Sequence, residues 1–88
     1  MAHKRISYGD IGQLLEAEGL QATATKETHT RFDHAPSQAA LILPRQRPTV
    51  VASTMDLHLV RRTMIDFGVM SEEEFDRWVA DPKRYQVA

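Results

Sequence analysis

The segment of residues 26–34 carries ionisable side chains at a spacing that could support chemistry. Side chains alternate between the two faces of an extended strand, so His29, Arg31 and Asp33 would share one face. Histidine has a reference pKa of about 6.5 and can accept a proton near neutral pH. An arginine two residues away could bind phosphate oxygens through its planar set of donors. The pattern therefore predicts a proton acceptor beside an anion-binding group.

These residues also have ordinary structural interpretations. A histidine on a strand surface usually has no catalytic role, and Arg31 could simply pair with Asp33 or with an acid on a neighbouring strand. His34 borders a turn and His58 falls within a predicted helix, so we expect both to be structural or solvated. No set of metal ligands is evident, because His29 and Asp33 would lie about 13 Å apart along a strand.

The strands that would position these residues are predicted from periodicity. Residues 20–26 alternate apolar and polar side chains, and residues 28–34 alternate in the same way. Residues 39–44 form a short apolar run that ends at Pro44. Because the three segments follow one another closely, we expect an antiparallel three-stranded meander. The side chains expected to face the helices are Thr28, Thr30 and Phe32.

Three helices are predicted around this sheet. Residues 7–18 show helical spacing of apolar residues, with Ser7 as the N-cap and Gly19 as a left-handed C-cap. A second helix is predicted for about residues 54–67, and a short third helix follows the Ser71 capping box. Since each helix has one apolar stripe, the helices should cover one sheet face. The aromatic residues expected in the core are Phe32, Phe67, Phe75 and Trp78.

The composition of the chain limits the classes of protein to which it can belong. The chain has 88 residues, no cysteine and a formal net charge of −1. This predicts one α+β domain over residues 7–80, a frayed N-terminus over residues 1–6 and a C-terminal tail over residues 81–88. No apolar run is long enough for a membrane span, and residues 1–10 do not form a secretory signal. The absence of cysteine fits a reducing compartment, and we expect the cytoplasm. Basic residues dominate residues 26–62 and acidic residues dominate residues 63–88.

The chain contains the short segments "LLEAEGL", "ETHTRF", "LILP" and "GVMSEEEF". Together they resemble segments of the HicA toxins, which are small RNA-cleaving proteins of bacterial toxin-antitoxin pairs. The segment "LLEAEGL" is similar to the end of their first helix, and "ETHTRF" stands where the family has "GSHxxF". The segments "LILP" and "GVMSEEEF" are similar to the third strand and to the close of the domain. The resemblance covers about residues 7–79.

The resemblance implies a fold, an activity and partners. The fold would be α-β-β-β-α, like a double-stranded-RNA-binding domain, with helices on one face of a three-stranded antiparallel sheet and a short C-terminal helix. The activity would be metal-independent RNA cleavage without a cofactor, centred on His29 of the second strand. Arg31 could bind the phosphate, and Lys26, Arg45 and Arg47 could extend the RNA-binding surface. An antitoxin protein would cover the histidine face, and the open sheet edges allow a homodimer.

A second hypothesis stays open on the same fold. Glu27 and Thr28 stand where the family has Gly-Ser, and an acid beside the site would repel phosphate. Together with the slightly acidic net charge, this favours a non-catalytic module. Such a module would bind RNA weakly, or would bind a protein partner through the open sheet face or an edge strand.

Overall fold

The computed structural model of the protein describes residues 5–26 and 28–85. It forms an α+β domain in the order α-β-β-β-α with an additional C-terminal helix, which confirms the predicted fold class. The sheet is antiparallel with the strand order β1-β2-β3. The elements are α1 (Tyr8–Ala17), β1 (Gln21–Lys26), β2 (His29–His34), β3 (Ala39–Pro44), α2 (Thr54–Asp66) and α3 (Glu72–Ala80).

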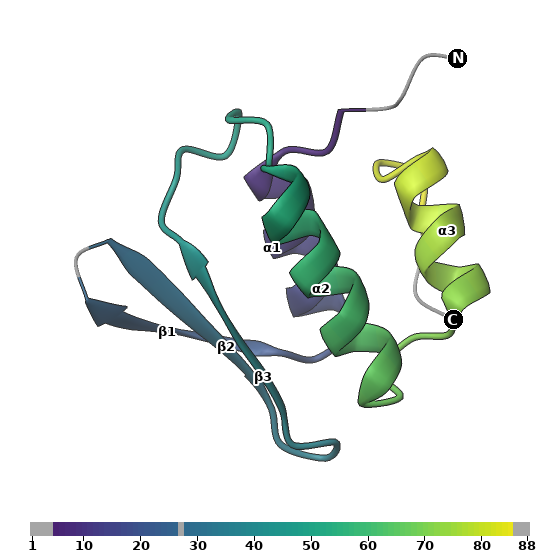
Figure 1. Cartoon of the computed structure of the whole chain (residues 1–88), viewed down its shortest axis with the longest axis horizontal. Coiled ribbons are helices and arrows are strands. Elements are labelled where there is room, and N and C mark those ends of the chain that lie inside the picture. Colours follow the sequence, from purple (N-terminus) through teal and green to yellow (C-terminus); the bar gives the residue numbers. More distant parts are fainter. Residues whose placement is uncertain (1–4, 27, 86–88) are drawn as a thin grey trace.

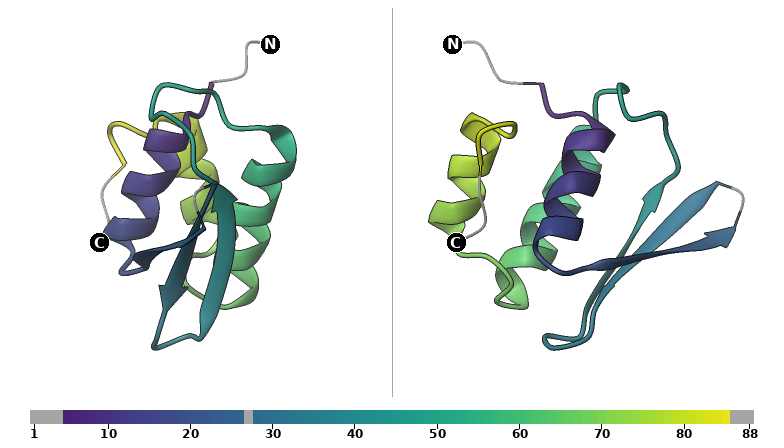
Figure 2. Two further views of the ribbon diagram at one scale, coloured as in Figure 1. Left: turned by 90° about the vertical axis from the view of Figure 1, so that its left-hand side faces the viewer. Right: turned by 180° about the vertical axis from the view of Figure 1, so that it is seen from behind.

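The elements are arranged in three layers (Figure 1). Helices α1 and α2 lie side by side on one face of the sheet, and α3 packs on the side of these helices that is remote from the sheet (Figure 2). The opposite face of the sheet carries no helix, as predicted. The ends of β1 and β2 on either side of residue 27 project beyond the helices. The domain is therefore packed on one side of the sheet and open on the other.

The two faces of the sheet follow from the register of the strands. In β2, Thr30 pairs with Leu43 and Phe32 pairs with Leu41, and these residues face the helices. We call this side the covered face and the opposite side the open face. The described residues of the open face are Gln21, Thr23, His29, Arg31, Asp33, Ala40, Ile42 and Pro44.

The core lies between the covered face and the helices. Phe75 and Trp78 dock α3, with ring centroids 5.2 Å apart. The prediction that Phe67 belongs to the core was wrong, because α2 ends at Asp66 and the Phe67 side chain is 49% exposed at the C-cap. The buried hydrophobic cluster consists of Ile6, Ile11, Leu14, Leu15, Leu20, Phe32, Leu41, Leu43, Val60, Met64, Met70, Phe75 and Trp78.

Local capping explains where the helices begin and end. Ser7 forms a reciprocal capping box with Asp10 at the start of α1, and Ser71 does the same with Glu74 at the start of α3. Both boxes satisfy backbone N–H groups that the first turn of a helix leaves unpaired. The C-cap of α1 is Glu18, and Gly19 directly after it takes the predicted left-handed conformation with a φ of 93°.

The folded unit is larger than the predicted span of residues 7–80. Ile6 is buried and its carbonyl accepts a hydrogen bond of 2.8 Å from the Ala52 amide, so it does not belong to a frayed end. Tyr85, expected in the tail, packs against the core and its hydroxyl donates to Glu18 at 3.4 Å. The other parts of the predicted ends, residues 1–4 and 86–88, lie outside the described residues, as does Glu27.

Candidate functional site

His29 is the first residue of β2 and is exposed on the open face. Its Nδ1 lies 2.8 Å from the Thr28 hydroxyl oxygen. If Nδ1 carries the proton and donates it to Thr28, the remaining ring nitrogen, Nε2, is unprotonated and can accept a proton. The Thr28 hydroxyl can accept from Nδ1 or donate to it, so this contact orients the ring and is compatible with the tautomer that a general base requires. The structure places the predicted catalytic residue where a substrate could reach it.

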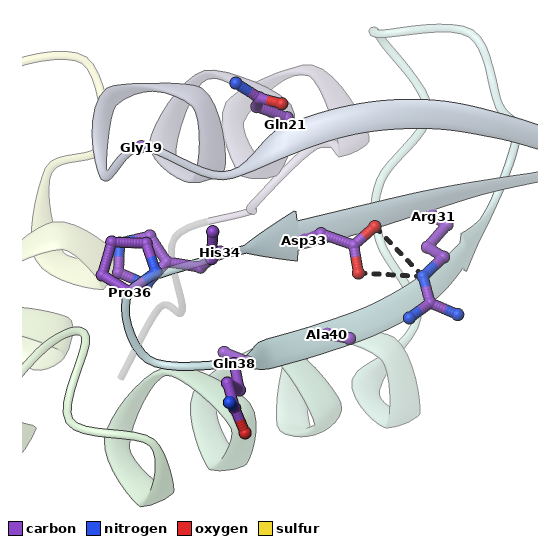
Figure 3. A pocket seen from close by; sticks show the side chains of 10 residues that line it. Gly19, Gln21, Arg31, Asp33, His34, Pro36, Gln38 and Ala40 are labelled. Atoms are coloured by element: carbon purple, nitrogen blue, oxygen red, sulfur yellow. Dashed lines mark hydrogen bonds and ion pairs between the residues drawn. The ribbon is translucent and has the colours of Figure 1, made fainter.

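Arg31 and Asp33 form an ion pair on the same face (Figure 3). The Nε of Arg31 is 2.9 Å from Oδ1 of Asp33 and 3.0 Å from Oδ2. About half of each side chain is exposed, at 47% and 43%, and an exposed pair of this kind contributes little to stability. Arg31 stands next to His29 on the open face, as predicted, but the Asp33 carboxylate offsets its charge.

The other basic residues of the predicted site lie around the same end of the sheet. The Cα of Lys26 is the register partner of His29 across β1 and β2. Arg45 directly follows β3, and its amide donates to the Thr28 carbonyl at 2.7 Å. Arg47 is exposed two residues further along the connector, the segment of residues 45–53 between β3 and α2.

Arg45 does not share the open face with His29. It lines a cavity of about 110 Å³ on the helix side of the sheet, together with Tyr8 and Thr30. This location follows from the register. The hydrogen bond from the Arg45 amide to the Thr28 carbonyl places Arg45 in the row of residues that faces the helices. The structure thus brings Arg31 and His29 together on one face and sets Arg45 at the end of the sheet, next to the opposite face.

A hollow of about 510 Å³ lies at the other end of the open face, beside the β2–β3 turn (Figure 3). Small residues leave the space, and Arg31 and Asp33 stand at its edge. Sequence reasoning did not find this hollow, although two adjacent alanines at the start of β3 could have indicated missing volume. The residues that line it are Gly19, Gln21, Arg31, Asp33, His34, Ala35, Pro36, Gln38, Ala39 and Ala40.

His34 and His58 have the surroundings expected of non-catalytic histidines. His34 is half-buried, and its Nδ1 is 2.6 Å from the Ser37 hydroxyl oxygen, which closes the β2–β3 turn. His58 is exposed on α2. Within the described residues, no group of three or more histidine, aspartate or glutamate side chains is placed to hold a metal ion.

Two groups with raised pKa values, Glu18 and Tyr85, lie on the helix side of the molecule. Partial burial raises the pKa of the Glu18 carboxyl above its ordinary value, and the negative charge of Glu74 raises it further. The hydrogen bond from Tyr85 and the proximity of His34 act in the opposite direction and are smaller in effect. Burial also raises the pKa of Tyr85, and the nearby Glu18 adds to that shift. Both groups belong to the packed side of the domain and are not part of the site around His29.

Comparison of the chain with protein-family models, with curated proteins and with solved structures finds no match among any of the three. In the described part of the chain, no helix has the length and apolar character needed to cross a membrane.

Proposed function

We propose that the protein is a HicA-like toxin that cleaves RNA without a metal ion, with His29 as the catalytic base. The observation that carries the proposal is the exposure of His29 on an open sheet face, with Nδ1 held by Thr28 and with Arg31 on the same face. Nε2 would remove the proton from a ribose 2′-hydroxyl, and the resulting oxygen would attack the adjacent phosphorus. The bond to the 5′-oxygen breaks, and solvent supplies the proton to this leaving group.

Arg31 would stabilise the charge that develops on the phosphate oxygens. Asp33 contacts only Nε of Arg31, so the two terminal amino groups of the guanidinium can donate to a phosphate while the half-exposed ion pair persists. Lys26, Arg45 and Arg47 would contact the RNA backbone where it passes the end of the sheet. An antitoxin that covers His29 would silence the enzyme, and the site of action would be the bacterial cytoplasm.

The experiment compares the purified parent protein with His29→Ala on a long unstructured RNA in the presence of a chelator. His58→Ala serves as the matched control, because His58 is an exposed histidine on α2. We expect cleavage by the parent and by His58→Ala and none by His29→Ala, with all three proteins folded. Equal cleavage by all three would assign the activity to another site or to a contaminant.

A second candidate function is favoured by the Arg31–Asp33 ion pair and by Ile42, which is 47% exposed beside it. On this sheet face the apolar Ile42 is exposed and the charge of Arg31 is offset by Asp33. Such a face suits a protein partner better than RNA. In this case neither the parent nor any variant cleaves RNA. Binding of the partner survives His29→Ala, whereas Ile42→Asp abolishes this binding. A strand at the free edge of β3, including one from a second copy, would be such a partner.

A further inference from the structure

The hollow beside the β2–β3 turn lies at the end of the sheet, where residues of the open face, such as Asp33, and His34 of the other row both line it. Gln21, Asp33 and Ala40 form one cross-strand row in register, so a polar side chain, an acid and a small residue lie next to one another. Ala40 has too little volume to fill its position, and Pro36 stands at the turn end of the space (Figure 3). A volume of about 510 Å³ is sufficient for a ligand of the size of a nucleoside.

The Asp33 carboxylate stands at the edge of this hollow and is turned toward Arg31 (Figure 3). Both of its oxygens face one donor, Nε of Arg31, so they act together as a pair of acceptors. Among the four RNA bases, only guanine has two adjacent donors on its Watson–Crick edge, N1–H and the N2 amino group. Adenine, cytosine and uracil place an acceptor beside their donor, and that acceptor would face the carboxylate unfavourably. The carboxylate is therefore matched to guanine.

Arg31 links this hollow to the residue proposed for catalysis. Along β2, His29, Arg31 and Asp33 succeed one another at intervals of about 7 Å on the same face. A phosphate that draws Arg31 away from Asp33 would release both carboxylate oxygens for a base. The His34 ring, held by Ser37, and the Pro36 ring at the turn offer surfaces against which a base can pack.

From this arrangement we propose that the hollow is a guanine-binding subsite, with Asp33 as the residue that recognises the base and Arg31 as the contact to its neighbouring phosphate. The inference rests on the proposed function to the extent that it takes single-stranded RNA as the ligand. It adds a sequence preference for guanosine next to the phosphate bound by Arg31. The recognition step needs no covalent chemistry.

The test measures binding to the full chain carrying His29→Ala, so that the RNA stays intact. The probes are short oligouridylates with one central guanosine, adenosine or inosine, and binding is followed by fluorescence anisotropy. Inosine keeps N1–H and lacks the N2 amino group. We expect guanosine to bind about tenfold more tightly than adenosine, with inosine in between.

Two further substitutions in the same background locate the preference. Asp33→Asn should remove the difference between guanosine and adenosine, and Ala40→Leu should remove it by filling the hollow. Asp66→Asn is the matched control, because Asp66 is an exposed aspartate at the end of α2, and it should keep the full preference. Circular dichroism checks that each variant is folded.

The outcomes separate this inference from the proposed function. Equal affinity for all three probes, absence of RNA binding, or a preference that survives both Asp33→Asn and Ala40→Leu would overturn the subsite. If the parent nevertheless cleaves RNA through His29, the proposed nuclease stands without the subsite. If guanosine is preferred and the parent does not cleave, the subsite stands and the nuclease proposal fails.

Discussion

The covered and open faces of the sheet are built by alternate residues of the same strands, yet their environments differ greatly. On the covered face, Phe32 and Leu41 are buried beneath α1 and α2. On the open face, His29 and Ile42 are exposed, and the ionic contact of Arg31 is with its own strand. It follows that the contacts that stabilise the fold lie mainly on one face. Residues of the other face can therefore serve a functional role without destabilising the fold.

The largest expected effect comes from adjacent residues of β3. Leu41 is 4% exposed and Ile42 is 47% exposed, although they differ by one position. Leu41→Ala should lower the free energy of unfolding by about 3 kcal/mol, because it removes core contacts and leaves a cavity. Ile42→Ala should lower it by about 1 kcal/mol or less, mainly through strand propensity. Urea unfolding of both variants measures the contrast, and similar losses would show that the open face is buried in solution.

The assignment of residues to faces could be predicted because it depends on local geometry. A strand alternates with a period of two, so the apolar and polar positions of β2 indicate its two faces wherever the strand packs. The capping boxes at Ser7 and Ser71 are likewise local, since each joins residues three positions apart. The candidate histidine followed from this alternation and from the motif around it.

Other features depend on contacts that are distant in the sequence. Ile6 is buried because the connector returns to pair with the start of the chain, where Ser7 bridges to Val51. The hollow beside the β2–β3 turn depends on the turn itself, in which Gln38 takes a φ of 63°. Such tertiary features leave no periodic signal, so periodicity alone could not reveal them.

Two glycines of α1 sharpen the contrast between packed and open positions within one helix. A Cβ on Gly9 would lie 2.9 Å from Cβ of Pro48 and 3.0 Å from its carbonyl oxygen, whereas a Cβ on Gly12 would meet nothing within 4 Å. Gly9→Ala should therefore destabilise the fold by about 1–2 kcal/mol through overpacking. Gly12→Ala should stabilise it by up to about 1 kcal/mol through helix propensity. Thermal unfolding compares the two variants. A higher melting temperature for both would show that the connector shifts to make room for the added methyl group at position 9.

Glu18 provides a test on the packed side that depends on pH. Its folded-state pKa is raised, chiefly by burial, above the ordinary value of 4.5, so the folded protein holds this proton more tightly than the unfolded chain does. The stabilisation of the folded state that results from this difference is complete at pH values below the pKa of Glu18 in the unfolded chain. It is lost as the pH rises through the pKa of Glu18 in the folded protein. Glu18 is also the C-cap of α1, where negative charge opposes the helix dipole.

Glu18→Gln should therefore raise the melting temperature relative to the parent near neutral pH, and the difference should shrink in acid as Glu18 becomes protonated. Glutamine keeps an acceptor for the Tyr85 hydroxyl, so the substitution tests the charge. Glu16→Gln, at an exposed position of the same helix, is the control. A difference between Glu18→Gln and the parent that grows toward acidic pH would contradict the sign of the shift.

The smallest expected effect concerns the ion pair of the open face. A double-mutant cycle with Arg31→Ala and Asp33→Ala should give a coupling energy of about 0.5 kcal/mol, because half-exposed pairs are well solvated. The coupling should weaken further in high salt, where mobile ions screen the charges. A coupling above about 2 kcal/mol would mean that Asp33 holds Arg31 firmly. Asp33 would then stay on Arg31 and could not accept hydrogen bonds from a base, and the charge on the open face would be structural in the same sense as the apolar contacts beneath the helices.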